Sequence, residues 1–100
     1  MIMEIWEGRF PSPVDRKQVE DFINNVAKPA REKAGCKMVR WAWTHTGEPM
    51  DVLTVIVELD SFADIERVWT VKEMQELAAE WGRRFPNAEG GRTKILEVIE

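Results

Sequence analysis

The chain has 100 residues and a formal net charge of −4, and we expect residues 1–100 to fold as one domain whose core needs neither disulfides nor metal. Cys36 is the only cysteine, which excludes an internal disulfide framework and a cysteine-rich zinc site. The acidic balance argues against nucleic acid and anionic membranes as partners, and no hydrophobic run has signal-peptide or transmembrane length. We therefore expect a soluble, cytoplasmic protein.

A strand and a helix are expected first. Residues 1–7 alternate weakly between hydrophobic and polar side chains before a group of turn formers, which predicts a short strand. A helix should follow, with capping-box spacing between Ser12 and Asp15, a kink at Pro29 and an end at Gly35. Apolar residues at steps of three and four form its inward stripe: Val19, Phe22, Ile23, Val26, Ala27 and Ala30.

A β-hairpin is expected next, because residues 36–46 and 50–59 alternate with a period of two on either side of turn formers. If residues of like parity share a face, one face is strongly apolar and should lie beneath the helices: Val39, Trp41, Trp43, Leu53, Val55, Val57 and Leu59. The opposite face is mixed: Met38, Arg40, Ala42, Thr44, Val52, Thr54, Ile56 and Glu58.

Two helices and a last strand should complete the domain. Ser61 and Asp64 predict a capping box for a short helix, and after a break Thr70 and Glu73 repeat that spacing before a longer one. The residues expected to face inward are Ile65, Val68 and Trp69 in the short helix and Met74, Leu77, Ala78, Trp81 and Phe85 in the long one. Residues 93–99 alternate as a strand after a loop.

The order strand, helix, strand, strand, helix, strand predicts an α+β, ferredoxin-like domain with a four-stranded antiparallel sheet and helices on one face. In this order of elements the chain resembles the dimeric α/β-barrel superfamily, especially its antibiotic-biosynthesis monooxygenase branch. The best local matches are residues 30–36 and 58–69. In that superfamily two sheets pack face to face inside a shared barrel, and a small ligand can lie between sheet and helices. The resemblance thus implies a homodimer.

The mixed sheet face is the predicted dimer interface. By alternation, the residues expected there are Glu4, Trp6, Arg40, Thr54, Glu58, Ile95, Glu97 and Ile99. Carboxylates and an arginine that share a buried interface usually pair and fix its register, which is the favoured interpretation. A catalytic acid–base group formed by the same residues is the alternative.

Five tryptophans and no tyrosine are the second unusual feature. The candidate ligand-binding residues, expected where the helices meet the sheet, are Phe22, Trp41, Trp43, Trp69, Met74 and Trp81. Two roles stay open for this set: the lining of a pocket for a flat aromatic ligand, or plain core packing, which is the commoner role for Trp41 and Trp43. Trp69, at the break between two helices, resembles a tryptophan of cofactor-independent monooxygenases and is a candidate catalytic residue.

Glu7 and His45 complete the candidate catalytic residues. His45 is the only histidine, and its side chain has the pKa range for proton transfer near neutrality, although its place at the hairpin end favours a solvated side chain.

No base is expected beside Cys36 and no metal-ligand spacing occurs, so neither nucleophilic catalysis nor a metal site is expected. The chain departs from the monooxygenase pattern at residues 6–9, where an asparagine is usual, and lacks the helix histidine of haem-degrading members. We expect no haem and no other cofactor.

Three functions stay open. The leading one is a cofactor-independent monooxygenase for aromatic or polyketide-like metabolites, in which Trp69 and a polar neighbour, Glu7 or Arg9, hold the substrate as an oxyanion. The alternatives are a polyketide cyclase or isomerase, and a non-catalytic binding dimer resembling the NIPSNAP group, which residues 63–69 also resemble. A space filled by Trp41, Trp43 and Trp81 would favour the last alternative. An open pocket lined by Trp69, Met74 and a few polar groups would favour an enzyme.

Overall fold

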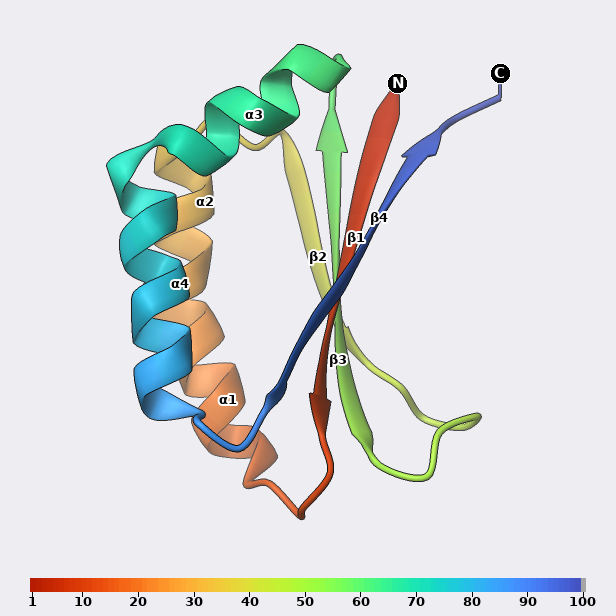
Figure 1. Ribbon diagram of the computed structural model, residues 1–100, viewed down its shortest axis with the longest axis vertical. Coiled ribbons are helices and arrows are strands. Elements are labelled where there is room, and N and C mark those ends of the chain that lie inside the picture. The colour runs from red at the N-terminus through yellow and green to blue at the C-terminus, as the bar shows by residue number, and fades with distance from the viewer. Residues whose placement is uncertain (100) are drawn as a thin grey trace.

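The computed structural model describes residues 1–99 and has the expected α+β architecture (Figure 1). The elements are β1 (Ile2–Phe10), α1 (Arg16–Phe22), the π-helical turn η1 (Ile23–Ala27), α2 (Lys28–Lys33), β2 (Met38–Trp43), β3 (Asp51–Leu59), α3 (Phe62–Thr70), α4 (Lys72–Arg84) and β4 (Glu89–Glu97). The strands form one antiparallel sheet in the order β2-β3-β1-β4. The predicted element order and sheet are confirmed.

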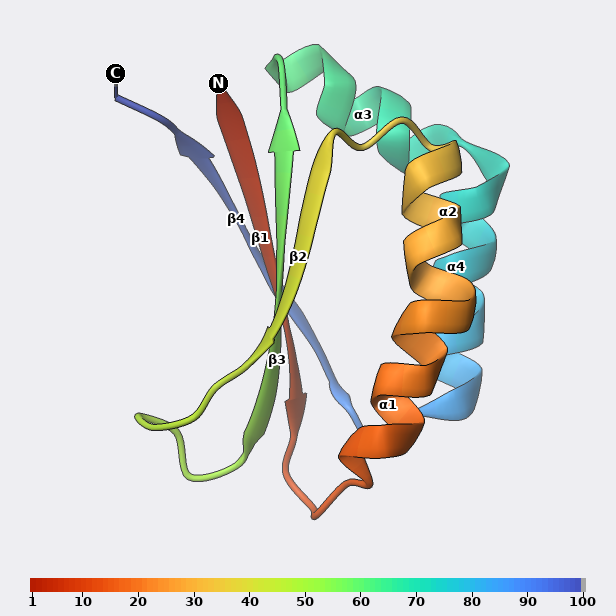
Figure 2. The same cartoon turned by 180° about the vertical axis from the view of Figure 1, so that it is seen from behind.

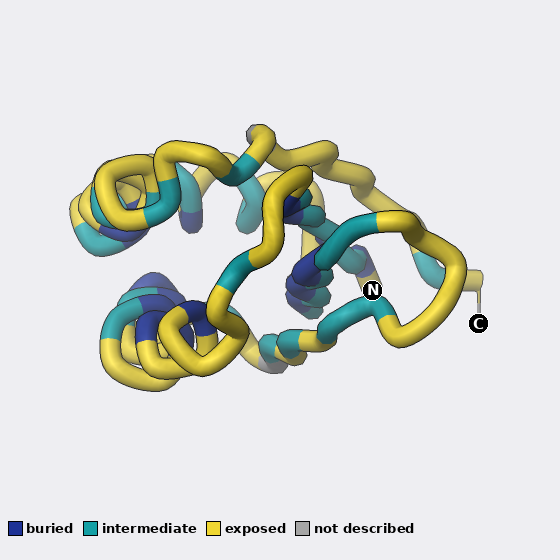
Figure 3. Tube along the Cα trace, turned by 90° about the horizontal axis from the view of Figure 1, so that it is seen from below, coloured by how far each residue is buried: buried dark blue, intermediate teal, exposed yellow. Residues whose placement is uncertain are grey.

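The helices form a layer on one face of the sheet. In Figures 1 and 2, α1, α2 and α4 run beside the sheet on the same side, while the connection between β2 and β3 bends toward the other side. Figure 3 shows that buried residues gather where the helices and the central strands face each other. Buried hydrophobic residues of this core include Ile2, Phe10, Val19, Phe22, Leu53, Val55, Val57, Leu59, Met74 and Leu77. The opposite face is not covered by any described helix, and we call it the open face.

The sheet face predicted for residues of β1 and β4 was wrong. Glu4 lies opposite Val57 and Trp6 opposite Val55, which are core residues, so both face the helices. Ile95 pairs with Glu4, and Glu97 pairs with Ile2, which puts them on the helix side as well. Apolar residues occur at both parities in β1, so hydrophobicity alone could not fix its face and only the pairing does. Of the predicted interface residues, Arg40, Thr54 and Glu58 do lie on the open face, whereas Ile99 lies beyond β4.

The strand bounds also differ from the prediction. β1 continues through Gly8 and Arg9 to Phe10, beyond the expected end at residue 7, because it pairs with β3 along its whole length. β4 begins at Glu89 and ends at Glu97, so it lies earlier than the expected residues 93–99. The glycines taken for a loop therefore belong to the strand.

Helix capping was predicted correctly at one of three positions. Ser61 and Asp64 form the capping box of α3. Asp15 itself is the N-cap of α1, accepting a hydrogen bond from the Lys17 N–H, so Ser12 has no capping role. Thr70 does not cap α4, because its hydroxyl donates to the Arg67 carbonyl at 2.9 Å. Val71, whose backbone is extended, nevertheless separates α3 from α4, as expected.

Candidate ligand-binding site

A cavity of about 280 Å³ lies between the helix layer and the sheet, and we call it the aromatic cavity. Its walls include Trp6, Phe22, Trp41, Trp69 and Trp81, with Arg31 as the charged residue among them. The sheet supplies Trp6 and Trp41, and the helices supply the others. The tryptophans therefore surround a space instead of filling it.

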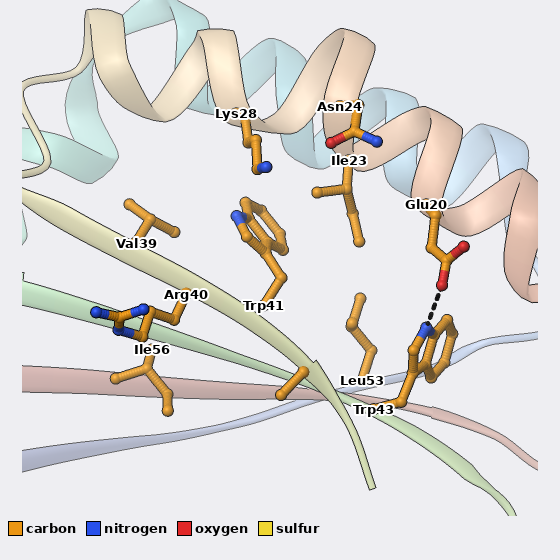
Figure 4. A pocket seen from close by; sticks show the side chains of 11 residues that line it. Glu20, Ile23, Asn24, Lys28, Val39, Arg40, Trp41, Trp43, Leu53 and Ile56 are labelled. Atoms are coloured by element: carbon orange, nitrogen blue, oxygen red, sulfur yellow. Dashed lines mark hydrogen bonds between the residues drawn. The ribbon is translucent and has the colours of Figure 1, made fainter.

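The structure brings four of the six candidate ligand-binding residues to this cavity: Phe22, Trp41, Trp69 and Trp81. Met74 is not among its lining residues, because its side chain is 0% exposed within the core. Trp43 lies farther along β2, where its indole N–H donates to Glu20 of α1 at 3.2 Å (Figure 4). Whether the four residues bind a ligand stays a prediction.

Trp43 belongs to a second hollow, a groove of about 560 Å³ along the β2 edge, which Figure 4 shows in close view. Lys28 and Glu20 overhang the groove from the helices, and Val39 and Trp41 line it from β2 (Figure 4). Trp41 lines both hollows and so stands between them.

Glycines make room for the aromatic wall. Trp6 and Trp81 meet edge to face with ring centroids 5.4 Å apart, a preferred aromatic geometry. A Cβ atom at Gly91 would overlap the Trp6 indole, and one at Gly8 would come within 2.7 Å of it. Gly91 reaches this position where the pairing of β1 with β4 shifts between Glu7 and Arg9. The bulge and the two glycines thus hold Trp6 at the cavity.

The end of α2 positions Arg31. Gly35 has φ +88°, its N–H donates to the Glu32 carbonyl at 3.0 Å, and the Cys36 N–H donates to the Arg31 carbonyl at 3.1 Å. This pair of bonds is a Schellman motif, which glycine permits because it has no Cβ. The predicted helix end at Gly35 is confirmed. The motif turns the chain so that Cys36 lies beside Arg31, within the stretch that carried the family resemblance.

A π-helical turn closely precedes Pro29, where the sequence predicts a kink. Pro29 has no backbone N–H to continue the α-helical ladder, and the π-helical turn Ile23–Ala27 precedes it, with the Lys28 N–H donating to the Ile23 carbonyl. Three helical segments, α1, η1 and α2, thus follow one another without a break. Ile23 and Ala27 of this turn line the cavity.

Arg31 is buried, with 4% of its surface exposed. Its guanidinium carbon lies 5.6 Å from the ring centroids of both Trp41 and Trp69, within the range of cation–π attraction. Among the described residues, its Nε and Nη1 atoms and the Nε1 atom of Trp41 are buried without a hydrogen-bond partner. Burial lowers the pKa of Arg31, while the nearby Cys36 and Glu4 act in the opposite direction.

Glu4 fixes the orientation of Trp69. Its side chain is 2% exposed, and its Oε2 accepts a hydrogen bond from the Trp69 indole N–H at 2.9 Å. This bond links β1 to the end of α3 and holds the indole in place beside the guanidinium of Arg31. Glu4, predicted at the dimer interface, therefore belongs to the surroundings of the cavity.

The three candidate catalytic residues are not brought together. Trp69 lines the aromatic cavity, whereas Glu7 pairs with Thr54 and points to the open face. His45 is exposed in the connection after β2. Arg9 also lies on the open face, where it pairs with Glu48 at 3.0 Å. The hypothesis that Glu7 or Arg9 helps Trp69 to hold an oxyanion was wrong, because the sheet separates them.

Arg31 is the charged residue of the cavity wall that the sequence analysis missed. It lies four residues after Ala27 and three before Ala34, both buried, so it falls on the inward stripe of the helix. A charged residue on an apolar stripe is an unusual signal that could have identified it. No such signal existed for Glu4, because the alternation of β1 is too weak.

Two further findings concern metal ligands and membrane-spanning helices among the described residues. Within residues 1–99, no group of three or more histidine, cysteine, aspartate or glutamate side chains is arranged as a metal would need. The helices of the same residues include none long and apolar enough to cross a membrane.

Comparison with known proteins shows the fold. No protein-family model matches the chain, and no curated protein matches its sequence. Solved structures with the same fold include HapK from Hahella chejuensis, with a TM-score of 0.74 and 14% identity over 99% of this chain and 93% of that one. A candidate antibiotic biosynthesis monooxygenase from Deinococcus radiodurans has a TM-score of 0.70 and 10% identity over 100% and 94% of the two chains.

A third similar structure concerns assembly. It is a dimeric ferredoxin-like protein of unknown function from Thermobifida fusca, with a TM-score of 0.72 and 18% identity over 97% of this chain and 90% of that one. The chain therefore has the ferredoxin-like fold that these proteins share, as predicted. At such identities the likeness concerns the fold alone.

Proposed function

We propose that the protein binds one small, flat aromatic molecule in the aromatic cavity. The observation that carries this proposal is that Trp41 and Trp81 leave about 280 Å³ between helices and sheet open. This volume lies just below the usual range for pockets that hold drug-sized ligands, which suits a molecule of one or two rings. Indole faces and edges favour aromatic rings as neighbours.

The leading activity is oxidation of the bound molecule by O2 without a cofactor. In such a reaction a ring CH2 group activated by an adjacent phenolate or enolate becomes C=O, and O2 supplies one oxygen atom to the product and the other to water. Support comes from the similarity of the fold to the candidate antibiotic biosynthesis monooxygenase. A cyclase or isomerase is less well supported, since it needs a free base and the carboxylate of Glu4 is already bonded to Trp69.

Tryptophan fluorescence tests the binding proposal. Titration with 2-naphthol and related phenols and quinones should give saturable quenching, because the indoles of the cavity contact the ligand. Trp69→Phe should remove much of this quenching, whereas the matched variant Trp43→Phe should retain it, since Trp43 lies in the groove outside the cavity. Equal quenching in the two variants would contradict the proposed site. Oxygen consumption is then assayed with bound compounds that carry an activated ring CH2 group, such as anthrone, because 2-naphthol and quinones have none, and no consumption with any of them would leave binding without oxidation.

We also propose that a second copy covers the open face. Ile5, Ile56 and Leu96 lie there among charged residues, and Leu96 is 42% exposed. The dimeric protein of similar fold supports self-association. Arg40→Ala should weaken the dimer, because Arg40 lies on this face. Sedimentation at several concentrations measures the effect, and unchanged dimer dissociation would contradict the role of Arg40.

A further inference from the structure

The charge of Arg31 has no use in the binding of a neutral aromatic molecule. None of the ion pairs among the described residues includes Arg31. Its Nε and Nη1 groups are buried without a partner, and so is the indole Nε1 of Trp41 beside it. Buried donors are normally satisfied, because an unmade hydrogen bond to a buried charge is costly. Three unsatisfied donors at one cavity wall therefore require an explanation.

The neighbours of Arg31 hold its position without satisfying these donors. Trp41 and Trp69 attract the guanidinium through their ring faces. Glu4 attracts it through space, yet the Glu4 carboxylate accepts its hydrogen bond from Trp69. The guanidinium is thus fixed in place while its Nε and Nη1 groups stay buried without an acceptor.

We infer that Arg31 anchors a negatively charged oxygen of the ligand, so that the protein recognises aromatic oxyanions, either carboxylates or phenolates. The inference rests on the proposed function, since it names the class of molecule that the aromatic cavity takes. The ring lies among Trp6, Phe22, Trp69 and Trp81, and the oxyanion accepts from the guanidinium of Arg31 and from the indole N–H of Trp41. Arginine suits this task because its guanidinium stays charged when buried and stacks on aromatic rings.

A matched pair of ligands tests the charge preference in the wild-type protein. 2-Naphthoate and 2-naphthamide have nearly the same shape and differ in charge. A charge-assisted hydrogen bond to a buried arginine should make naphthoate bind about tenfold to a hundredfold more tightly, as measured by fluorescence titration. Equal affinities would overturn the inference and leave the proposed function standing. Failure of both compounds, and of the neutral phenols, to bind would overturn the proposed function itself.

A second arm distinguishes the two oxyanions. The affinity for 2-naphthol is measured while the pH is raised until the phenol ionises. An affinity that rises with ionisation supports a phenolate, and an affinity that stays low while naphthoate binds supports a carboxylate. A fall in naphthol affinity on ionisation, together with no preference for naphthoate, would contradict anion recognition of either kind.

Variants of Arg31 assign the preference to this residue. Arg31→Gln should lower naphthoate affinity about tenfold to a hundredfold and change naphthamide affinity little. Arg83→Gln is the control, because it removes the same charge from the exposed end of α4. Arg31→Lys keeps the charge and should retain part of the preference, which keeps the test valid if Arg31→Gln does not fold. Full retention of the preference in Arg31→Gln would exclude Arg31 as the anchor.

Discussion

On the open face Arg9 pairs with Glu48 at 3.0 Å and both side chains reach solvent, whereas on the helix-covered side Arg31 and Glu4 are buried and form no ion pair with each other. Partly exposed pairs of the first kind contribute little to stability and cost little. Buried charges of the second kind oppose folding unless they find partners. The buried charges on the helix side therefore oppose folding in the ligand-free molecule, which agrees with the proposed anchoring role of Arg31.

Leucines on the two faces of the sheet differ in burial, and the same substitution on each face should give the largest difference in stability. Leu53→Ala removes a side chain that is 1% exposed on the helix side and should lower the free energy of unfolding by about 2–5 kcal/mol. Leu96→Ala, on the open face, should change the unfolding of the monomer by less than about 0.5 kcal/mol. Urea denaturation at low protein concentration measures both. Similar losses in the two variants would mean that the open face is as tightly packed as the core.

A smaller effect is expected from closing the cavity. Gly91→Ala places a Cβ where the Trp6 indole lies, so the ring must move and the free energy of unfolding should fall by about 1–3 kcal/mol. Gly82→Ala is the matched control, because nothing lies within 4 Å of a Cβ at that position in α4. This second variant should gain about 0.5–1 kcal/mol from the better helix propensity of alanine. Unchanged ligand quenching and stability in Gly91→Ala would contradict the role of Trp6 in the cavity wall.

The buried charges give the third prediction. Glu4→Gln keeps an acceptor for the Trp69 N–H but removes the negative charge near Arg31, so the free energy of unfolding should fall by about 1–2 kcal/mol. In an Arg31→Gln background the same change should cost less, because the charge that Glu4 offsets is gone. A double-mutant cycle in urea provides the measurement. Additive effects would show that the two residues act independently.

The sequence predicted the fold well because its signals were local. Gly35 after an amphipathic helix, the capping box at Ser61 and Asp64, and the two-residue period around the hairpin each indicated one element, and the order of elements then determined the sheet. The candidate site was predicted only in part. Trp69 and Trp81 were found because helical spacing places them inward.

The rest of the site could not be read from local pattern. The faces of Glu4 and Trp6 depend on pairing with β3, since apolar residues occupy both parities of β1. The separation of Glu7 from Trp69 follows from the same register. Nor does the two-residue period of β2 show that the Trp43 indole N–H donates to Glu20, outside the cavity, while Trp41 remains in the cavity wall. Register and tertiary contact decide these points.

Cys36, beside Arg31 on the helix side, should contribute a small pH-dependent term to stability. Burial raises the pKa of its thiol, and the guanidinium of Arg31 opposes that rise. The folded thiol therefore keeps its proton at a pH where the thiol of the unfolded chain, with an ordinary pKa of about 8.5, has lost it. The unfolded state then binds fewer protons, so stability is complete below about pH 8.5 and decreases as the pH rises above that value.

Cys36→Ala isolates this contribution. The loss of stability with rising pH should be small, because Cys36 is only partly buried. Urea unfolding of both proteins between pH 7.5 and 10 should show the wild type losing stability faster than the variant, and parallel curves would contradict a raised pKa. Iodoacetamide should also alkylate Cys36 more slowly than it alkylates free cysteine. The positive charge of Arg31 limits the rise in the Cys36 pKa, and an anion bound at Arg31 would offset that charge. Naphthoate should therefore slow the alkylation further. Naphthamide, which is neutral, should not.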